Sequence, residues 1–148
     1  MDILDKYEQI YQDYAKFMQE NSKYKPENGK KLVIKTSTNY SSYFPIINFE
    51  LSNCLPTNEI TNQKEEYFEG YYFTINIYTK NLTTGTRVKV AKETIAKELA
   101  NLTVAFFNKK NMLRTLFKPI PNLDDDIYRI NIQYQCQIGN VHGNIYRK

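Results

Sequence analysis

Two segments in which apolar residues occupy every second position, with a long helical pattern between them, constrain the fold of this chain most. The segments are residues 71–78 and 127–136. A period of two is typical of strands, because successive side chains point to opposite faces of a sheet. Aromatic rings fall on both faces of the first segment, which predicts a central strand partly covered on both sides. The second segment predicts a strand with one solvated face.

Between these strands, apolar residues recur at steps of three and four from Val88 to Phe106. This spacing predicts a helix from about Arg87 to Asn108, because residues three and four apart share one face of a helix. Thr86 is the expected N-cap, and Asn81–Gly85 is expected to form a turn before it.

A second helix is predicted at the N-terminus. Apolar side chains from Ile3 to Met18 follow one stripe at helical spacing. Asp2 is a plausible N-cap, and Asn21–Ser22 is expected to end the helix. A polar loop, Lys23–Lys31, should follow it.

Further strands are expected on weaker patterns. They are Leu32–Ile34, Phe44–Leu51, Met112–Lys118 and a short last strand, Ile145–Arg147. Gly70 is expected to mark a bulge before the central strand, and Pro56–Glu66 is expected to form an exposed loop.

The order of these elements predicts the fold class. Strands occur in runs between two helices rather than alternating singly with helices, which favours an α+β fold. We expect an antiparallel or mixed sheet, with the N-terminal helix and one long helix packed on one face. The 148 residues fit a single domain, 1–148.

Composition bears on the class of function. A net charge of +4, from 20 basic and 16 acidic residues scattered along the chain, is too small to indicate nucleic-acid binding by itself. The 13 tyrosines and 8 phenylalanines suit sheet faces and protein interfaces. No apolar run reaches the length of a membrane span, and the N-terminus does not resemble a signal peptide, so no membrane association is expected.

No catalytic, cofactor or metal site is predicted. His142 is the only histidine and falls in a predicted loop without a nucleophile motif, and Cys54 and Cys136 lack ligand spacing. Asp124–Asp126 could attract a cation, but the glycine and glutamate of an EF-hand loop are missing, which favours a solvated turn. The residues therefore indicate binding and assembly rather than an enzyme.

Two alternatives stay open at this point. An exposed sheet face carrying Tyr72, Tyr78 and Arg129 could imitate an RNA-reading sheet, which would make the chain a small nucleic-acid-binding α+β module. An uncharacterised enzyme is the other alternative, because paired carboxylates distant in sequence leave no local motif.

Residues Phe73–Lys80, the helix that follows them and Lys118–Arg129 resemble the tail-completion or tail-terminator proteins of long-tailed bacteriophages, often labelled minor capsid or neck proteins. The order of elements agrees with this family along nearly the whole chain. The resemblance implies a structural virion protein, located in the tail or neck and assembled in the host cytoplasm. It implies a homo-hexameric ring that caps the tail tube and joins the tail to the head.

The resemblance also implies partners. These are the tail-tube protein, a head-completion or connector protein, and DNA that passes through the channel without specific binding. The acidic loop Asp124, Asp125 and Asp126 is expected to face the channel lumen or bulk solvent, because three adjacent carboxylates repel one another unless water screens them. Pairing with Lys or Arg of a neighbouring subunit is the alternative for this loop.

Overall fold

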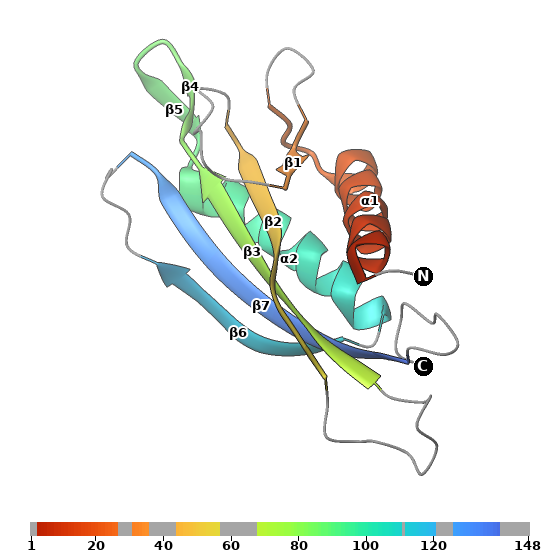
Figure 1. Cartoon of the computed structure of the whole chain (residues 1–148). Helices are drawn as coiled ribbons and strands as arrows, with labels where there is room; N and C mark the ends of the chain where they lie inside the picture. Colours follow the sequence, from red (N-terminus) through yellow and green to blue (C-terminus); the bar gives the residue numbers. More distant parts are fainter. Residues whose placement is uncertain are drawn as a thin grey trace.

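Two helices cover one face of a five-stranded mixed sheet (Figure 1), which confirms the predicted α+β class. The computed structural model describes residues 3–26, 31–35, 44–56, 68–110, 112–120 and 126–139. The helices are α1 (Ile3–Asn21) and α2 (Lys92–Lys109), of 19 and 18 residues. The strands are β1 (Val33–Ile34), β2 (Ile46–Pro56), β3 (Phe68–Thr79), β4 (Leu82–Thr84), β5 (Arg87–Val90), β6 (Leu113–Ile120) and β7 (Tyr128–Gly139).

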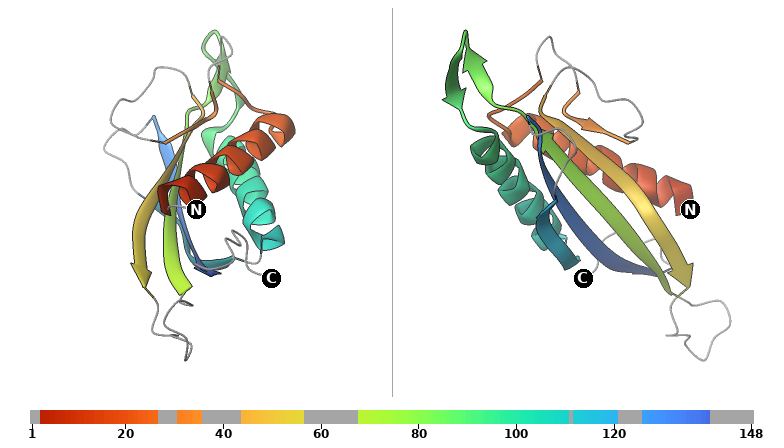
Figure 2. Two further views of the ribbon diagram at one scale, coloured as in Figure 1. Left: turned by 45° about the vertical axis from the view of Figure 1, so that its right-hand side comes forward. Right: turned by 90° about the vertical axis from the view of Figure 1, so that its left-hand side faces the viewer.

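The large sheet has the strand order β1-β2-β3-β7-β6. β1 runs parallel to β2, and the other neighbours are antiparallel. The two strands with the clearest alternation in the sequence, β3 and β7, are therefore the central ones. β4 and β5 form a separate hairpin that projects beyond the end of the sheet (Figures 1 and 2).

Aromatic rings fill the layer between the sheet and the helices, which lie on the same side of the sheet in both views of Figure 2. Phe49 of β2 is fully buried, and its ring centroid lies 5.4 Å from those of Phe73 and Tyr14. Phe107 of α2 stacks on Tyr134 of β7 at 4.5 Å. Such offset and tilted ring pairs stabilise a core beyond the burial of their area.

A buried hydrogen bond joins the two helices. Thr103 Oγ1 donates to the Leu99 carbonyl oxygen at 2.9 Å, so the Tyr14 hydroxyl donates to Thr103 Oγ1 at 2.7 Å. Burial raises the pKa of the Tyr14 hydroxyl well above its usual range, and the bond to Thr103 acts in the opposite direction. The folded state therefore holds this proton at a pH at which the unfolded chain releases it.

Tyr14→Phe is expected to reduce the alkaline sensitivity of the fold. A tyrosine whose pKa is raised in the folded state stabilises the fold fully at pH values below the pKa of the unfolded chain, 10.0. This stabilisation is lost as the pH rises towards and through the pKa of the folded protein. At pH 7 the free energy of unfolding of the variant should be about 1 kcal/mol lower than that of wild type, because one hydrogen bond is lost. Between pH 10 and pH 11 it should decrease less steeply than that of wild type. Urea unfolding at pH 7, 10 and 11 measures both effects. An equal decrease in the free energy of unfolding of the two proteins between pH 10 and pH 11 would contradict this account.

The predicted start of the second helix, at about Arg87, is wrong. Residues 87–90 are strand β5, and the helix begins at Lys92, with Ala91 as an N-cap that makes no side-chain hydrogen bond. Thr86 is not a cap but lies in the hairpin turn beside Gly85, whose φ of 64° favours glycine. Asn81–Gly85 is likewise not a turn alone, because Leu82–Thr84 form β4.

Two other sequence expectations were wrong in detail. Gly70 keeps regular register with Leu55 and Gln137, and the irregularity lies in β2 between Leu51 and Asn53. β2 continues to Pro56, which we had placed in the following loop. The rest of that loop, together with Asp2 and residues 145–147, lies outside the described residues.

Candidate functional site

The sheet face opposite the helices carries a row of hydrogen-bonded amides. Asn48, Asn76 and Asn131 stand opposite one another on β2, β3 and β7, and all three are buried. Asn76 Oδ1 accepts from Asn131 Nδ2 at 2.8 Å and from Arg129 Nη2 and Nε at 2.9 and 3.2 Å. These bonds offset the cost of burying the amides of Asn76 and Asn131, which are therefore structural elements of the sheet.

The structure brings Tyr72, Tyr78 and Arg129, the three residues of the RNA-sheet hypothesis, onto this same face. The guanidinium carbon of Arg129 lies 5.4 Å from the centre of the Tyr78 ring, and Tyr78 is only 3% exposed. A base cannot stack on a ring that is buried beneath the protein's own cation. Tyr72, which is half-buried, would then be the one of the two rings open to a base.

The edge strand β6 exposes apolar side chains on both of its faces. Leu113 is opposite Gln135 on the amide face and is 53% exposed, and Phe117 is opposite Ile132 on the helix face and is 41% exposed. The Arg114 guanidinium lies over the Phe117 ring at 5.5 Å. Among the described strands, β7 alone pairs with β6, so the outer edge of β6 can receive another chain.

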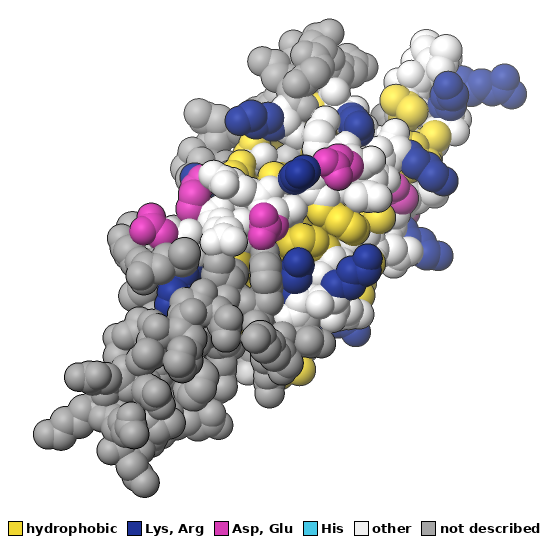
Figure 3. Space-filling model, turned by 90° about the vertical axis from the view of Figure 1, so that its right-hand side faces the viewer, with side chains coloured by type: hydrophobic (Ala, Val, Ile, Leu, Met, Phe, Trp, Pro, Cys, Tyr) yellow, Lys and Arg dark blue, Asp and Glu magenta, His cyan; other side chains and the backbone are white. Residues whose placement is uncertain are grey.

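A groove of about 420 Å³ lies at the other edge of the sheet, between α1 and β1. Its apolar lining comes from Ala15, Leu32 and Val33 and from the ring of Tyr11, and its remaining lining residues are Gln12, Gln19 and Lys31. The Tyr11 hydroxyl donates to the Val33 carbonyl oxygen at 3.2 Å, which fixes α1 against this edge. Figure 3, which faces the α1 side, shows hydrophobic side chains exposed among charged ones.

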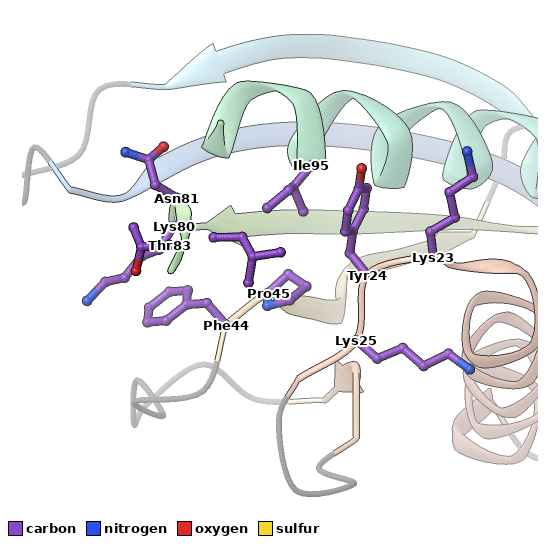
Figure 4. Close-up of a pocket in the computed structure, with 10 residues that line it drawn as sticks. Lys23, Tyr24, Lys25, Phe44, Pro45, Lys80, Asn81, Thr83 and Ile95 are labelled. Atoms are coloured by element: carbon purple, nitrogen blue, oxygen red, sulfur yellow. The ribbon is translucent and has the colours of Figure 1, made fainter. Parts of the chain in front are cut away.

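A second hollow, of about 310 Å³, lies at the base of the β4–β5 hairpin (Figure 4). Tyr24, Pro45 and Ile95 contribute to its apolar part. Its lining includes the cations Lys23, Lys25 and Lys80 and no carboxylate. The Lys80 ammonium lies over the Phe44 ring at 4.9 Å.

The residues singled out from the sequence are only partly placed. Asp126 is exposed in the turn before β7, whereas Asp124, Asp125 and His142 lie outside the described residues, as does the side chain of Cys54. The side chain of Cys136 is buried on the helix face of β7. In the described ranges, no three His, Cys, Asp or Glu side chains gather as a metal site would require.

Sequence analysis missed the surfaces that stand out in the structure. Leu113 and Phe117 lie in a segment without clear periodicity, because both faces of β6 are partly exposed. The absence of a pattern in a strand-compatible, basic segment was the available signal for an edge strand. Arg87 and Lys89 were assigned to a helix, which concealed their position on a projecting hairpin.

No protein-family model matches this chain, and the comparison with curated proteins finds no similar sequence. Neither described helix combines the length and the apolar character that crossing a membrane requires.

Proposed function

We propose that this chain is a structural protein of a long-tailed bacteriophage. It assembles head to tail into a six-fold ring that caps the tail tube and joins the tail to the head connector. Its partners are further copies of itself, the tail-tube protein and a head-completion or connector protein. The virion tail or neck is its location in this proposal.

The observation that carries the proposal is a pair of different surfaces at opposite edges of one sheet, one with exposed apolar side chains and one with a groove. β6, with Leu113 and Phe117, forms one edge, and the groove between α1 and β1 forms the other. A ring needs an interface of this kind, in which each copy presents one surface to the preceding neighbour and another to the following one. Leu113 and Phe117, which are exposed in the single chain, would be buried between copies.

Charge supports the same pairing of edges. β6 contains Arg114 and Lys118 and no carboxylate, whereas α1 contains four carboxylates and two lysines. One of those carboxylates, Glu8, forms an ion pair with Lys35 beside the groove. With Lys31 and Lys35 included, the α1 edge has four carboxylates and four lysines and no net charge. Contact of β6 with this edge therefore avoids the like-charge repulsion that β6 against β6 would bring, which favours the head-to-tail register.

The order of elements agrees with the tail-terminator resemblance. An N-terminal helix is followed by strands, a second long helix and the antiparallel pair β6 and β7. Both helices lie on one face of the sheet, as the resemblance implies.

Electron microscopy of the protein mixed with the tail-tube protein of the same genome tests the function. We expect rings with six-fold symmetry at one end of each tube and shorter tubes as the protein concentration rises. Tubes that grow to the same length with bare ends would contradict a terminator role. Binding along the tube wall, with the ends bare, would contradict it equally.

A further inference from the structure

Positive charge is concentrated at the end of the molecule that carries the β4–β5 hairpin. Arg87 and Lys89 lie on β5, and Lys23, Lys25 and Lys80 line the hollow at the base of the hairpin. None of these five cations forms an ion pair with a carboxylate of the described residues. The hairpin itself, residues 82–90, contains no acidic residue. It projects at the upper right of Figure 3 with Lys and Arg side chains around it.

The hairpin is an exposed ribbon rather than part of the core. Every residue from Asn81 to Lys89 is exposed. In addition to the cations, the ribbon presents Asn81, Thr83, Thr84 and Thr86, whose side chains can donate hydrogen bonds. Such donors next to cations are the groups that contact phosphate oxygens in nucleic-acid complexes.

The two exposed apolar side chains of the hairpin do not form one apolar face. Leu82 is opposite Val90, whereas Val88 is opposite Thr83, the neighbour of Leu82 in sequence. The register shifts between Leu82 and Thr83, so Val88 and Val90 do not share a face as they would in a regular strand. Along β4 successive residues alternate, and Leu82 and Val88 therefore lie on opposite faces of the ribbon. Insertion into a membrane or an apolar groove needs a single apolar face, and this hairpin does not have one.

The hollow at the hairpin base is not built for one small phosphate either. Figure 4 shows the ammonium groups of Lys23, Lys25 and Lys80 pointing in different directions, away from a common centre. A single phosphate site needs donors that converge on it. Cations spread along a surface instead suit a polyanion, which presents a separate phosphate to each of them.

We propose that the hairpin end, formed by Lys23, Lys25, Lys80, Arg87 and Lys89, binds the phosphate backbone of duplex DNA without sequence preference. This contact goes beyond ring assembly, which uses the two sheet edges, and a single chain can make it. In a ring whose channel carries DNA, several hairpins would act on one duplex and hold it reversibly.

The energetics predict a measurable salt dependence. Each phosphate contact contributes about −0.9 to the slope of log K against log salt concentration. With about four contacts, affinity should fall on the order of 100-fold between 50 and 200 mM NaCl. Binding of this type depends on the phosphate charges and not on contacts with base edges, so duplexes of unrelated sequence should bind with similar affinity.

Fluorescence anisotropy with a labelled 30-base-pair duplex tests the assignment at several salt concentrations. The double variant Arg87→Gln/Lys89→Gln should reduce the magnitude of the slope by about 1.8, since two contacts are lost. The matched control is Lys16→Gln/Lys109→Gln, which removes the same charge at exposed positions on α1 and at the far end of α2. It should leave the slope within about 0.5 of wild type. Circular dichroism and thermal melting establish that each variant is folded.

Four results would overturn the proposal. Equal loss of slope in both double variants would mean that net charge alone governs binding. Absence of duplex binding at 50 mM NaCl would show that the hairpin end does not bind DNA. A strong preference between unrelated duplexes would indicate sequence-specific contacts with the bases. Displacement of the duplex by inorganic phosphate at constant ionic strength would place a discrete phosphate site in the hollow.

Discussion

Leu113→Asp combined with Phe117→Asp is expected to leave the chain folded and to abolish ring formation. Leu113 is 53% and Phe117 41% exposed in the single chain, so the carboxylates can reach water there. In an interface the apolar contacts would be lost and each carboxylate would be removed from water, at a cost of several kcal/mol. Association should weaken by at least about 1,000-fold, which corresponds to about 4 kcal/mol. Light scattering across a concentration series measures the change.

Val88→Asp is the matched control, because it places a carboxylate at another exposed apolar position, 51% exposed and outside both sheet edges. This variant should assemble like wild type. Assembly of the β6 double variant at wild-type concentrations would show that β6 lies outside the interface.

A mixing experiment separates head-to-tail from two-fold assembly. Ala15→Arg should block the groove between α1 and β1 while leaving β6 intact, because Ala15 lines that groove. The β6 variant and the groove variant should each be monomeric alone. Mixed in equal amounts, they should form a dimer and nothing larger, because only one intact pair of surfaces remains. A dimer of the groove variant alone would indicate that β6 pairs with β6.

Phe49→Ala is expected to have the largest effect on stability. The Phe49 ring contacts rings from α1, α2 and β3, including Tyr14, Phe73 and Phe107, and is fully buried. Removing a buried phenylalanine costs about 3–5 kcal/mol, a large part of the stability of a typical domain. Urea unfolding measures the loss. Phe117→Ala makes the same chemical change at an exposed ring and should cost under about 1 kcal/mol, so similar losses would contradict the central position of Phe49.

The central strands could be predicted because burial of one face imposes alternation on their sequences. Phe73, Ile75 and Ile77 of β3 face the helices, and so do Ile130 and Ile132 of β7. The α1 stripe was equally clear, since Ile10, Tyr14 and Met18 all face the core.

Local patterns predict the wrong element where strand and helix signals overlap. Val88 fits the helical spacing of α2, but β-branched residues and the turn at Gly85 favour the hairpin. The polar face of β7 was expected to be solvated, and Asn131 is instead buried. The hydrogen bond that offsets its burial goes to Asn76, which is 55 residues away in sequence, so no local pattern indicates it.

The candidate surfaces depend on topology even more strongly. The strand order makes β6 an edge strand, and the residues of β6 indicate this only through their lack of an apolar pattern. The acidic loop is different, because the sequence identified it and the structure describes only Asp126.

Replacing Asp124, Asp125 and Asp126 with Asn should leave the fold and the ring intact if the loop faces the lumen or solvent. Loss of the ring with the monomer still folded would show that the loop lies at an interface.

The central claim is that copies of this chain close into a ring through two different sheet edges. Native mass spectrometry of the protein, free over a range of concentrations and bound to tail tubes, tests that claim most directly. We expect a species with the mass of six chains, with no accumulation of two-fold dimers as it forms. A mass of one chain in both the free and the tube-bound protein would contradict the ring.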